Sequence, residues 1–542
     1  MKANRKFIFT VAAAGVAAGI SACGGSPAPV DAAQACAALA GQTVAGATAS
    51  AALVAASGPV PGYCNISATI APALNFEMRI PNNWNGKLHY GGGGGFDGVI
   101  QKIYDAAGGG GTDADNHGLN LAALSKGYIN ISSDSGHQGK IPGYEAIDAS
   151  WFPGNPTAQR LYADLAVPSV MAAAVEMIKK VYGSAPGKSY FEGCSNGGRE
   201  ALMTAQRYPT LFDGIIARAP ASNFVASLGS FQNNMRMVAT NPSLNFTAAK
   251  VRLLSKAVLA ACDGLDGVVD GIVSNPAACT FDAASARSTL RCTGGADTGD
   301  SCLSDAQLAV VDTWTASKTF AGKYTTPGWA LTGNESALNN WDAWLFGGFQ
   351  FAFQYGGIAG IIQQDAKTQP LPPQDASALD TLAFDFDAPA NAAALNAIAA
   401  AFDASNPDLR PFMNNGRKLL LWHGGADPAL SSKNTTGYYQ SVVATVGGQA
   451  AADAFARYYI APGVNHCHGG VGADKSDLLT ALDAWVSNGT APSGLTASKL
   501  AGDGSAAFSR PLCAYPLYAR YTGPANDANA ARLASNYACT SP

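Results

Sequence analysis

Short apolar runs that end in turns recur along the chain and predict the strands of a sheet. They occupy residues 87–90, 128–131, 189–192, 418–422 and 456–460. Glycine, serine or proline follows each run, as expected where buried strands pass into loops. Residues 161–182 and 477–487 instead carry apolar side chains at three- and four-residue spacing, which predicts helices. Strands that alternate with helices indicate a mostly parallel, doubly wound α/β sheet.

Residues 221–403 break this alternation. The segment holds four of the cysteines, many Asp-Gly turns and a dense aromatic stretch. We interpret it as an inserted domain that divides a catalytic domain into residues 36–220 and 404–542. The aromatic stretch has two interpretations, because it forms either an ordinary core or a cap over an aromatic substrate. Its residues are Trp341, Trp344, Phe346, Phe349, Phe351, Phe353 and Tyr355.

The N-terminus predicts export. Basic residues precede the apolar run Phe7–Ile20, which is too short to span a bilayer as a helix of about 20 residues. The following Ile20-Ser21-Ala22-Cys23 resembles a bacterial lipobox, so we expect residues 1–23 to be a signal peptide and residues 24–35 a tether. The alternative is an ordinary cleavage site before a cysteine. We expect a periplasmic or outer-membrane lipoprotein, lipidated at Cys23, or a secreted protein, with membrane contact only through that anchor.

Composition narrows the class of partner. The chain has 542 residues, 48% of them hydrophobic, which is ample for a folded core. Lys and Arg number 34 against 38 Asp and Glu, so the net charge is −4. Without a basic surplus, nucleic acid is excluded as a partner. We expect a small-molecule substrate and a monomer or weak oligomer.

Cysteine usage supports an oxidising compartment. Of 11 cysteines, 10 remain once Cys23 is set aside, which is enough for five disulfides. The sequence does not fix their connectivity, but four local pairs are plausible: Cys36–Cys64, Cys262–Cys279, Cys292–Cys302 and Cys513–Cys539. Cys194 and Cys467 are then left, either as a fifth bridge or as two buried thiols.

A nucleophile motif follows the run at 189–192. Gly193-x-Ser195-x-Gly197 lies between this predicted strand and a helix-like run at 200–208. A strained strand-to-helix turn of this kind exposes a serine hydroxyl at the edge of an α/β sheet. We predict that Ser195 is a nucleophile, the alternative being an ordinary glycine-rich turn.

The serine needs a base and an orienting carboxylate, in the order serine, acid, histidine. His466 follows the run at 456–460 and Asp427 follows the run at 418–422. His468 is an alternative base, and His423 is either a structural or a pocket-lining residue. A Cys194–Cys467 bridge would favour His466, since it would hold the two loops within about 7 Å of each other.

An acyl-transfer site also needs donors for an oxyanion. One is the backbone N–H of Asn196, which follows the nucleophile, and the other comes from a loop after an early strand. We select Gly92 in the Gly91–Gly95 turn, which is otherwise only a flexible turn.

Three carboxylates on one glycine-containing turn predict a calcium site. Asp263, Asp266 and Asp270 would repel one another unless a hard cation neutralised them, and oxygen ligands favour Ca²⁺ over zinc. Carbonyls of Val268 and Ile272 would complete the shell. The spacing is not that of an EF-hand, and the alternative is an exposed turn. No organic cofactor is expected.

Together these residues resemble the tannase and feruloyl esterase family. Its hallmark pairs Cys-Ser and His-Cys around an Asp, as in Cys194-Ser195, Asp427 and His466-Cys467. The resemblance extends to the aspartate loop, to Phe386-Asp387 and to the closing Arg510–Pro516 stretch. It implies an α/β-hydrolase fold with a large inserted lid that carries the calcium site, and the five disulfides named above.

The resemblance implies hydrolysis of phenolic acid esters by a serine carboxylesterase. One branch of the family acts on mono(2-hydroxyethyl) terephthalate and clamps its carboxylate with a lid arginine. Residues 324–408 contain no arginine and one lysine, Lys367, so a neutral hydroxycinnamoyl or galloyl ester fits better. A competing class is a non-catalytic, calcium-stabilised lipoprotein that binds aromatic molecules. The candidate pocket residues are His423, Leu430, Trp344 and Phe346.

Overall fold

A computed structural model describes residues 30–102, 118–239, 244, 246–366, 380–525 and 527–542. The predicted signal peptide, Cys23, residues 24–29 of the predicted tether and Lys367 lie outside these residues.

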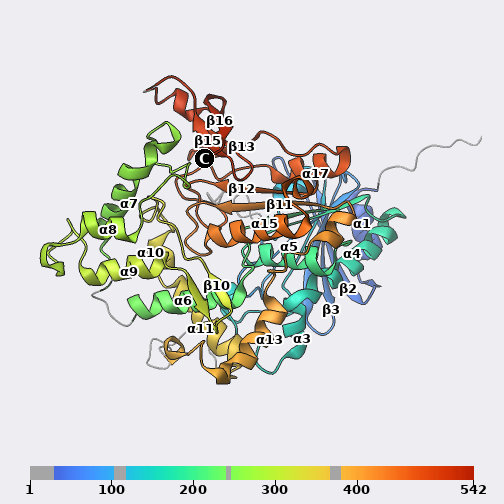
Figure 1. Ribbon diagram of the computed structural model, residues 1–542. Coiled ribbons are helices and arrows are strands. Elements are labelled where there is room, and N and C mark those ends of the chain that lie inside the picture. Colours follow the sequence, from blue (N-terminus) through green and yellow to red (C-terminus); the bar gives the residue numbers. More distant parts are fainter. Residues whose placement is uncertain (1–29, 103–117, 240–243, 245, 367–379, 526) are drawn as a thin grey trace, which may run out of the picture.

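A ten-stranded sheet forms the centre of the molecule (Figure 1). Its strand order is β1-β2-β3-β4-β6-β5-β7-β8-β11-β12, and all strands from β6 to β12 in this order run parallel. The parallel strands are β6 (Ile129–Ser133), β5 (Lys87–Gly91), β7 (Lys188–Cys194), β8 (Gly214–Arg218), β11 (Lys418–Gly424) and β12 (Ala456–Ala461). The predicted parallel sheet is thus present, and β8 is a strand that the apolar runs did not reveal.

Antiparallel strands extend one side of this sheet. They are β1 (Thr43–Val44), β2 (Ala47–Val54), β3 (Tyr63–Ile70) and β4 (Leu74–Pro81), and β4 joins β6 antiparallel. The sequence of β2, ATASAALV, has little contrast between apolar and polar positions. For that reason these strands escape a periodicity argument.

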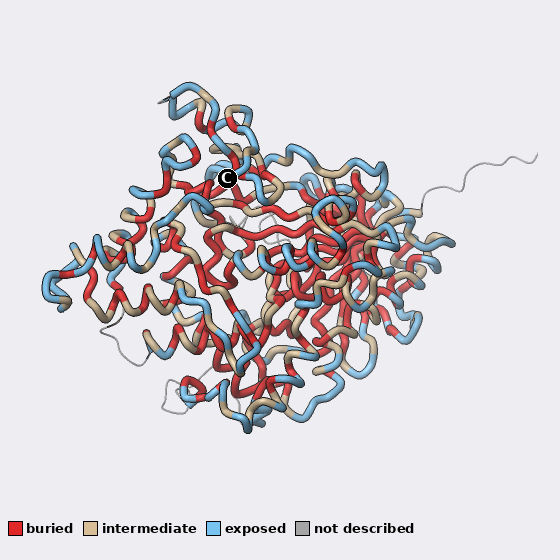
Figure 2. The backbone as a smooth tube through the Cα atoms, viewed as in Figure 1, coloured by how far each residue is buried: buried red, intermediate tan, exposed pale blue. Residues whose placement is uncertain are grey.

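Helices cover both faces of the sheet. One face is packed by α1 (Ala32–Leu39), α4 (Ala166–Tyr182), α5 (Asn196–Arg207), α15 (Ser432–Val446) and α16 (Gln449–Asp453). The other face is packed by α2 (Leu121–Ser125) and α17 (Leu478–Asn488). Burial follows this layering, because the strands are buried and the outward sides of the helices are exposed (Figure 2).

One helix in the described part of the chain is long and apolar enough to cross a membrane. It runs over Pro156–Tyr182 and comprises α3 (Pro156–Arg160), the π-turn η2 (Leu161–Leu165) and α4. Its side chains Val170, Met171 and Ile178 are buried against the sheet. This packing is that of a core helix in the folded protein.

A mainly helical insert leaves the sheet after β8 and returns at β11. Its helices are α6 (Phe224–Val238), α7 (Ala248–Cys262), α8 (Ala283–Leu290), α9 (Asp305–Thr315), α10 (Trp341–Trp344), α11 (Phe349–Tyr355) and α13 (Ala392–Phe402). The strands β9 (Lys318–Phe320) and β10 (Tyr324–Thr326) form a small hairpin. In Figure 1 the insert occupies the side of the molecule away from β2 and β3.

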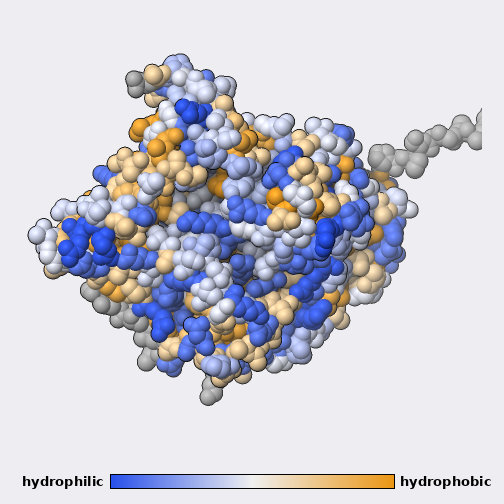
Figure 3. All heavy atoms as spheres, in the orientation of Figure 1, coloured by the Kyte–Doolittle hydropathy of each residue, from blue (hydrophilic) through white to orange (hydrophobic). Residues whose placement is uncertain are grey.

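The insert has its own apolar core, which continues onto the catalytic domain through Phe96, Tyr162 and Leu430. Its outer tip is hydrophilic (Figure 3), and there Arg287 and Arg291 of the α8 region pair with Asp305 and Asp312 of α9. After α14 (Arg410–Asn414) the chain rejoins the sheet at β11.

Two small hairpins close the chain. The strands β13 (Leu495–Leu500) and β14 (Ala506–Leu512) pair with each other, as do β15 (Tyr518–Tyr521) and β16 (Tyr537–Thr540). Arg510 of β14 pairs with Asp270 of the insert, so this terminal segment lies against the aspartate loop.

Candidate active site

Ser195 lies on a sharp turn between β7 and α5. Its backbone has φ 62° and ψ −119°, a left-handed conformation that costs energy for any residue other than glycine. Its N–H donates to the carbonyl of Arg218 (3.1 Å), and its own carbonyl accepts the N–H of Ala221 (3.0 Å). Bonds to the adjacent strand end therefore hold the strained turn in place.

The glycines around Ser195 are required by close backbone contacts. A Cβ atom at Gly193 would lie 2.6 Å from the carbonyl carbon of Gly197. One at Gly197 would lie 2.6 Å from the carbonyl oxygen of Gly93, and one at Gly198 would lie 2.3 Å from that of Arg218. The G-x-S-x-G pattern is thus a packing requirement of the turn.

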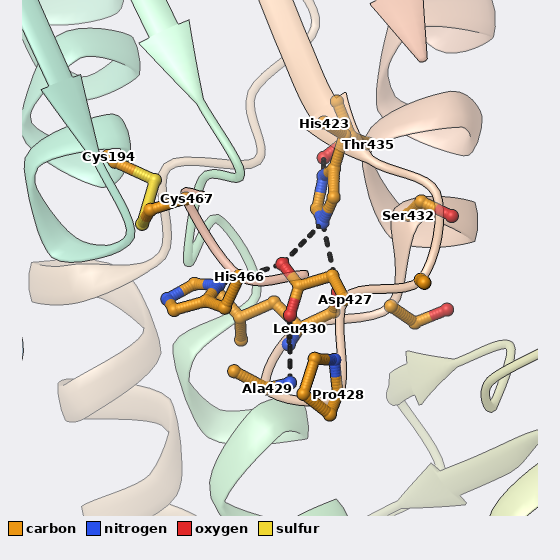
Figure 4. A network of polar contacts seen from close by, with 12 residues as sticks. Cys194, His423, Asp427, Pro428, Ala429, Leu430, Ser432, Thr435, His466 and Cys467 are labelled. Carbon is orange, nitrogen blue, oxygen red and sulfur yellow. Dashed lines mark hydrogen bonds and ion pairs between the residues drawn. A yellow bond between two sulfur atoms is a disulfide. The ribbon is translucent and has the colours of Figure 1, made fainter. Parts of the chain in front are cut away.

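Asp427 and His466 meet at the ends of β11 and β12 (Figure 4). Nδ1 of His466 lies 2.7 Å from Oδ2 of Asp427. Oδ1 of Asp427 accepts the N–H groups of Ala429 (2.8 Å) and Leu430 (2.9 Å). Burial alone would raise the pKa of Asp427, but the neighbouring His466 and His423 hold it well below its usual range. Asp427 is therefore ionised and requires a proton on Nδ1 of His466.

His423 contacts the same oxygen of Asp427 that His466 contacts. Its Nε2 lies 3.0 Å from Oδ2 of Asp427 and 2.9 Å from the carbonyl of Leu430, and its Nδ1 lies 2.8 Å from the hydroxyl of Thr435. Because His423 is fully buried beneath Asp427, it does not line the cavity beside Ser195. The expectation that it lines the pocket was wrong, and its other interpretation, a structural histidine, describes these contacts.

A disulfide joins the two loops that carry Ser195 and His466. Cys194 and Cys467 are bonded, with their Cα atoms 5.9 Å apart (Figure 4). The other bridges are Cys36–Cys64, Cys262–Cys279, Cys292–Cys302 and Cys513–Cys539. The connectivity is the one that the family resemblance implies.

Ser195 and His466 line one narrow cavity of about 50 Å³. Its walls are mostly apolar: Gly95, Phe96, Ala221, Phe224, Leu228, Phe231, Trp344, Phe353, Ala429 and Leu430. The polar side chains among them are Tyr162, Asn196 and Ser227, and among the described residues no Lys, Arg, Asp or Glu lines it. His468 is likewise not among the described residues that line it.

The insert contributes much of this apolar wall. Trp344 packs edge-on against His466, with ring centroids 5.4 Å apart, and stacks on Phe353 at 5.9 Å. Phe346 instead packs against Phe246 and Trp341 inside the insert and does not line the cavity. The expectation for Phe346 was therefore wrong, because its side chain faces the core of the insert. Sequence reasoning missed Tyr162, Phe224 and Phe231, since spacing does not show which aromatic side chains converge.

The choice of Gly92 as an oxyanion donor is also wrong. Its N–H donates to the carbonyl of Glu192 (2.9 Å), because Gly92 continues the β5–β7 ladder by one residue. The N–H of Gly93 is occupied as well, by Oε2 of Glu200 (3.0 Å). Gly95, further along this loop, lines the cavity with Ser195.

A larger groove of about 830 Å³ lies on the other side of the Asp427 loop. It is lined by residues 276–283 and 329–332 of the insert and by Gly425, Lys433 and Pro462 of the catalytic domain. Neither Ser195 nor His466 reaches it. We assign the candidate site to the smaller cavity, since it brings the predicted nucleophile Ser195 and the predicted base His466 together.

The aspartate loop follows α7. Asp263 accepts the N–H groups of Asp270 (3.1 Å), Gly271 (2.9 Å) and Ile272 (3.3 Å). Asp270 pairs with Arg510, and Oδ1 of Asp266 accepts the N–H of Val268 (3.1 Å). The described residues contain no group of three or more His, Cys, Asp or Glu side chains placed to hold a metal ion. The expected cluster of three carboxylates around one cation is thus not shown.

One feature of this loop nevertheless suits a cation. Oδ2 of Asp266 is buried and has no hydrogen-bond partner among the described residues. Burial, aided by the charges of Asp270 and Asp263, raises the pKa of Asp266 to about 6.

A family model and several known proteins match the chain over most of its length. A family model described as "Tannase and feruloyl esterase" matches residues 59–540. The chain is 33% identical to mono(2-hydroxyethyl) terephthalate hydrolase of Piscinibacter sakaiensis, over 91% of this chain and 87% of that protein. It is 28% identical to feruloyl esterase B of Aspergillus niger, over 85% and 84% of the two chains.

Solved structures share the fold. Feruloyl esterase B from Aspergillus oryzae superposes with a TM-score of 0.76 at 23% identity and covers 94% of this chain and 100% of its own. The tannin acyl hydrolase from Aspergillus niger gives a TM-score of 0.68 at 20% identity, with 95% of each chain covered.

Proposed function

Since the chain belongs to the tannase and feruloyl esterase family, we propose that it is an exported serine esterase that hydrolyses phenolic acid esters. The observation that carries this proposal is that Ser195 and His466 line one cavity while His466 contacts the ionised Asp427. Residues 221–403 then act as the lid that covers the site, since their aromatic side chains wall the cavity.

The reaction would proceed by acyl transfer in two halves. Asp427 keeps the proton of His466 on Nδ1, which leaves Nε2 free to accept the proton of the Ser195 hydroxyl. The serine oxygen attacks the ester carbonyl carbon, and the alcohol leaves with the proton that His466 returns. Water then enters by the same route, releases the acid and restores Ser195.

The negative oxygen of each tetrahedral intermediate needs backbone donors. Asn196 begins α5, where the first N–H groups of a helix lack partners within the helix. Because the N–H groups of Gly92 and Gly93 already have hydrogen-bond partners, we place the second donor at the N–H of Gly95, which lines the cavity. Both residues line the same cavity as Ser195.

The apolar wall favours a neutral acyl group. A buried carboxylate on the substrate would need a charged partner, and no Lys or Arg is found among the described residues that line the cavity. A hydroxycinnamoyl or galloyl ester meets no such requirement. Its ring would lie among Phe224, Phe231, Trp344 and Phe353.

A second candidate activity is hydrolysis of mono(2-hydroxyethyl) terephthalate. The 33% identity to the Piscinibacter enzyme of that name favours it, and the uncharged cavity opposes it. Rates measured on methyl ferulate, methyl gallate and the terephthalate monoester separate the two. We expect kcat/KM to be highest for a neutral ester, and a preference for the monoester would reverse the order of the candidates.

The catalytic assignment is tested with p-nitrophenyl acetate. Ser195→Ala should reduce kcat to the background rate while leaving the melting temperature close to that of the wild type, since Ser195 is half-buried and small. Equal activity in the wild type and Ser195→Ala would instead indicate a protein that binds aromatic molecules without hydrolysing them.

We further propose that the aspartate loop binds a structural Ca²⁺ ion. Its oxygen-only donors fit that ion, with the unpartnered Oδ2 of Asp266 and the carbonyls of Val268 and Ile272 available beside Asp263 and Asp270. The ion takes no part in the reaction. Exhaustive chelation should lower the melting temperature, because only the folded chain presents the site. An unchanged melting temperature together with no calcium by elemental analysis would refute this assignment.

Export is the last part of the proposal. Five disulfides in the folded chain support an oxidising compartment. We propose that residues 1–23 direct export and that Cys23 carries the lipid. Mass spectrometry of the mature N-terminus, with Cys23→Ala as the control, distinguishes a lipoprotein from a secreted protein.

A further inference from the structure

Two carboxyl groups lie together beneath the glycine loop and take no part in the steps above. Asp97 is 1% exposed and Glu200, on α5, is 7% exposed. The hydroxyl of Ser135 bridges them, because it donates to Oδ2 of Asp97 and lies 3.1 Å from Oε1 of Glu200. Both acids are thus held at one buried point.

Among the described residues, we find no Lys or Arg paired with Asp97 or Glu200, whose partners are Ser135, Asn196 and the N–H of Gly93. The guanidinium of Arg199 donates to Oδ1 of Asn196 (2.6 Å) and to the carbonyls of Tyr162 (2.8 Å) and Ala163 (3.1 Å). Two carboxyl groups that contact one buried hydroxyl would repel each other strongly if both were ionised. Burial and the charge of Glu200 accordingly raise the pKa of Asp97 well above its usual range.

Glu200 and Asp97 are hydrogen-bonded to the two segments that would supply the oxyanion donors. Oε2 of Glu200 accepts the N–H of Gly93 (3.0 Å), and Oδ1 of Asp97 accepts the side-chain amide of Asn196 (2.8 Å). A Cβ atom at Gly93 would lie 2.7 Å from the Asp97 carboxyl group. The loop therefore rests directly on the acids, with no room for a side chain between them.

Other titratable groups face the pair from the surrounding elements. The hydroxyl of Tyr90 on β5 is hydrogen-bonded to that of Ser133 (2.9 Å). The hydroxyl of Tyr162 lies 2.9 Å from the carbonyl oxygen of Gly95 and 3.1 Å from Oδ1 of Asn196, either of which can accept its proton. Burial lowers the pKa of His137 to about 4, so His137 is neutral near pH 7.

Asp134 is the remaining carboxylate in this region. It accepts bonds from Asn75, Gly136 and Gln138, and therefore has its own donors. None of these groups supplies a cation to Asp97 and Glu200.

We propose that Asp97 and Glu200 share one proton and that this pair positions the Gly93–Gly95 loop and Asn196 beside Ser195. The inference rests on the esterase function proposed above. Both acids are positioning residues, since neither lines the cavity. Ionisation of the second acid would set two like charges against each other and displace the loop, so hydrolysis should fall at alkaline pH.

Amide substitutions test the shared proton by kinetics on p-nitrophenyl acetate. Asp97→Asn mimics the protonated acid, so we expect kcat to fall less than tenfold and its alkaline decline to move to higher pH. The double variant D97N/E200Q removes the carboxylate that accepts the bridging hydrogen bonds. Its kcat should fall on the order of 10²-fold, as for a site displaced by about 1 Å, with KM within about threefold.

A merely structural role predicts a different result. It would lower the folded fraction without moving the pH profile, or would raise KM instead of lowering kcat. If Asp97→Asn and the double variant have the same kcat and the same pH profile, the proposal is wrong.

Infrared difference spectroscopy gives a readout that is independent of activity. At pH 7 the wild type and Ser195→Ala should both show the C=O stretching band of a protonated carboxylic acid, and Asp97→Asn should lose it. Asp148→Asn is the control, since Asp148 is fully buried but accepts backbone N–H groups of Lys140 (2.9 Å) and Ser150 (2.7 Å).

The two proposals fail separately in this design. Absence of the acid band from the wild type overturns the shared proton whatever the activity. Undiminished hydrolysis by Ser195→Ala overturns the esterase assignment whatever the spectrum.

Discussion

Asp403 is a half-buried residue whose carboxyl group is poorly solvated, so that its ionisation opposes folding. It follows α13 and its Oδ1 accepts the N–H of Val225, near the start of α6 (3.3 Å). Burial outweighs this bond and raises the pKa of Asp403 to about 6. A raised pKa means that the folded state binds the proton more tightly than the unfolded state. The resulting stability is present below about pH 4 and is lost as the pH rises through 6.

We therefore expect Asp403→Asn to be more stable than the wild type at pH 7, by up to about 3 kcal/mol for a shift of roughly two pKa units. Melting temperatures at half-unit steps from pH 4 to 7 measure the effect, and the variant should lack part of the wild-type decline. Asp408→Asn is the control, because the exposed Asp408 beside Arg410 has a pKa of about 2 and titrates below this window. Parallel curves for Asp403→Asn and the wild type would contradict the assignment.

Single residues show how far sequence reasoning reaches. Strand ends and glycine spacing select Ser195, Asp427 and His466, because the chemistry of a triad fixes its residue types. The structure brings His466 against Asp427 and lines one cavity with Ser195 and His466, and their catalytic roles stay a prediction. Gly92 was chosen wrongly because the pairing of β5 with β7 continues by one residue. That pairing occupies the N–H of Gly92, and the sequence does not show where a strand pairing stops. Asp97 and Glu200 are 103 residues apart, so no local sequence pattern predicts that their carboxyl groups lie together.

At the scale of elements, Asn340 connects the insert to both loops of the proposed triad. It lies just before α10 and is 3% exposed. Its side-chain amide donates to the carbonyl of Ala426 (2.9 Å) and to Oδ1 of Asn465 (2.8 Å). Asn465 in turn donates to the carbonyl of Leu338 (3.0 Å). These bonds fix the residues that immediately precede Asp427 and His466.

Asn340→Ala should therefore lower kcat by about tenfold or more, because loss of a buried hydrogen-bond pair costs about 1–3 kcal/mol and loosens the acid and base loops. KM should change less than kcat. The neighbouring Asn339 is exposed and has a positive φ of 61°, so Asn339→Gly is the matched control and should leave both constants nearly as they are. If Asn340→Ala and Asn339→Gly change kcat and KM by the same amounts, the hydrogen bonds of Asn340 do not position the two loops.

The parallel strands and the long helices were predictable because their apolar side chains have the spacing expected of buried strands and of helices packed on a core. The strands β1–β4 were not, since their alanine, serine and threonine residues give little contrast. The position of the insert followed from the break in the alternation of strands and helices. The sequence did not show which of its aromatic side chains line the cavity and which pack in the core of the insert. Trp344 lines the cavity and Phe346, two residues on, faces the core of the insert.

At the scale of the whole molecule, the Cys194–Cys467 bridge ties together the two halves of the catalytic domain. It spans 273 residues of sequence, so the chain-entropy model predicts a stabilisation of roughly 5 kcal/mol at most. Replacing both cysteines by serine should lower kcat on the order of 10²-fold with little change in KM, since the bridge holds nucleophile and base together. Assays must be run well below the melting temperature of the variant.

The bridge Cys292–Cys302 is the matched control. It closes a loop of 10 residues in the insert and contributes nothing to the cavity wall. Serine at both positions should lower the melting temperature without altering kcat. If the two double variants lose activity alike, the effect of the first is general destabilisation. Non-reducing peptide mapping shows directly whether residues 194 and 467 are linked.

The pairing of β8 with β11 has a consequence for the order in which the enzyme is made. Ribosomes finish the serine turn early, yet the neighbour that completes its sheet begins only at Lys418. Until then β8 is an open edge, and Asp427 and His466 do not exist. On the proposed mechanism, a nascent chain that ends before His466 carries Ser195 without the residue that would deprotonate it. Hydrolysis would then begin only after β11, β12 and the His466 loop have joined the sheet, late in translation.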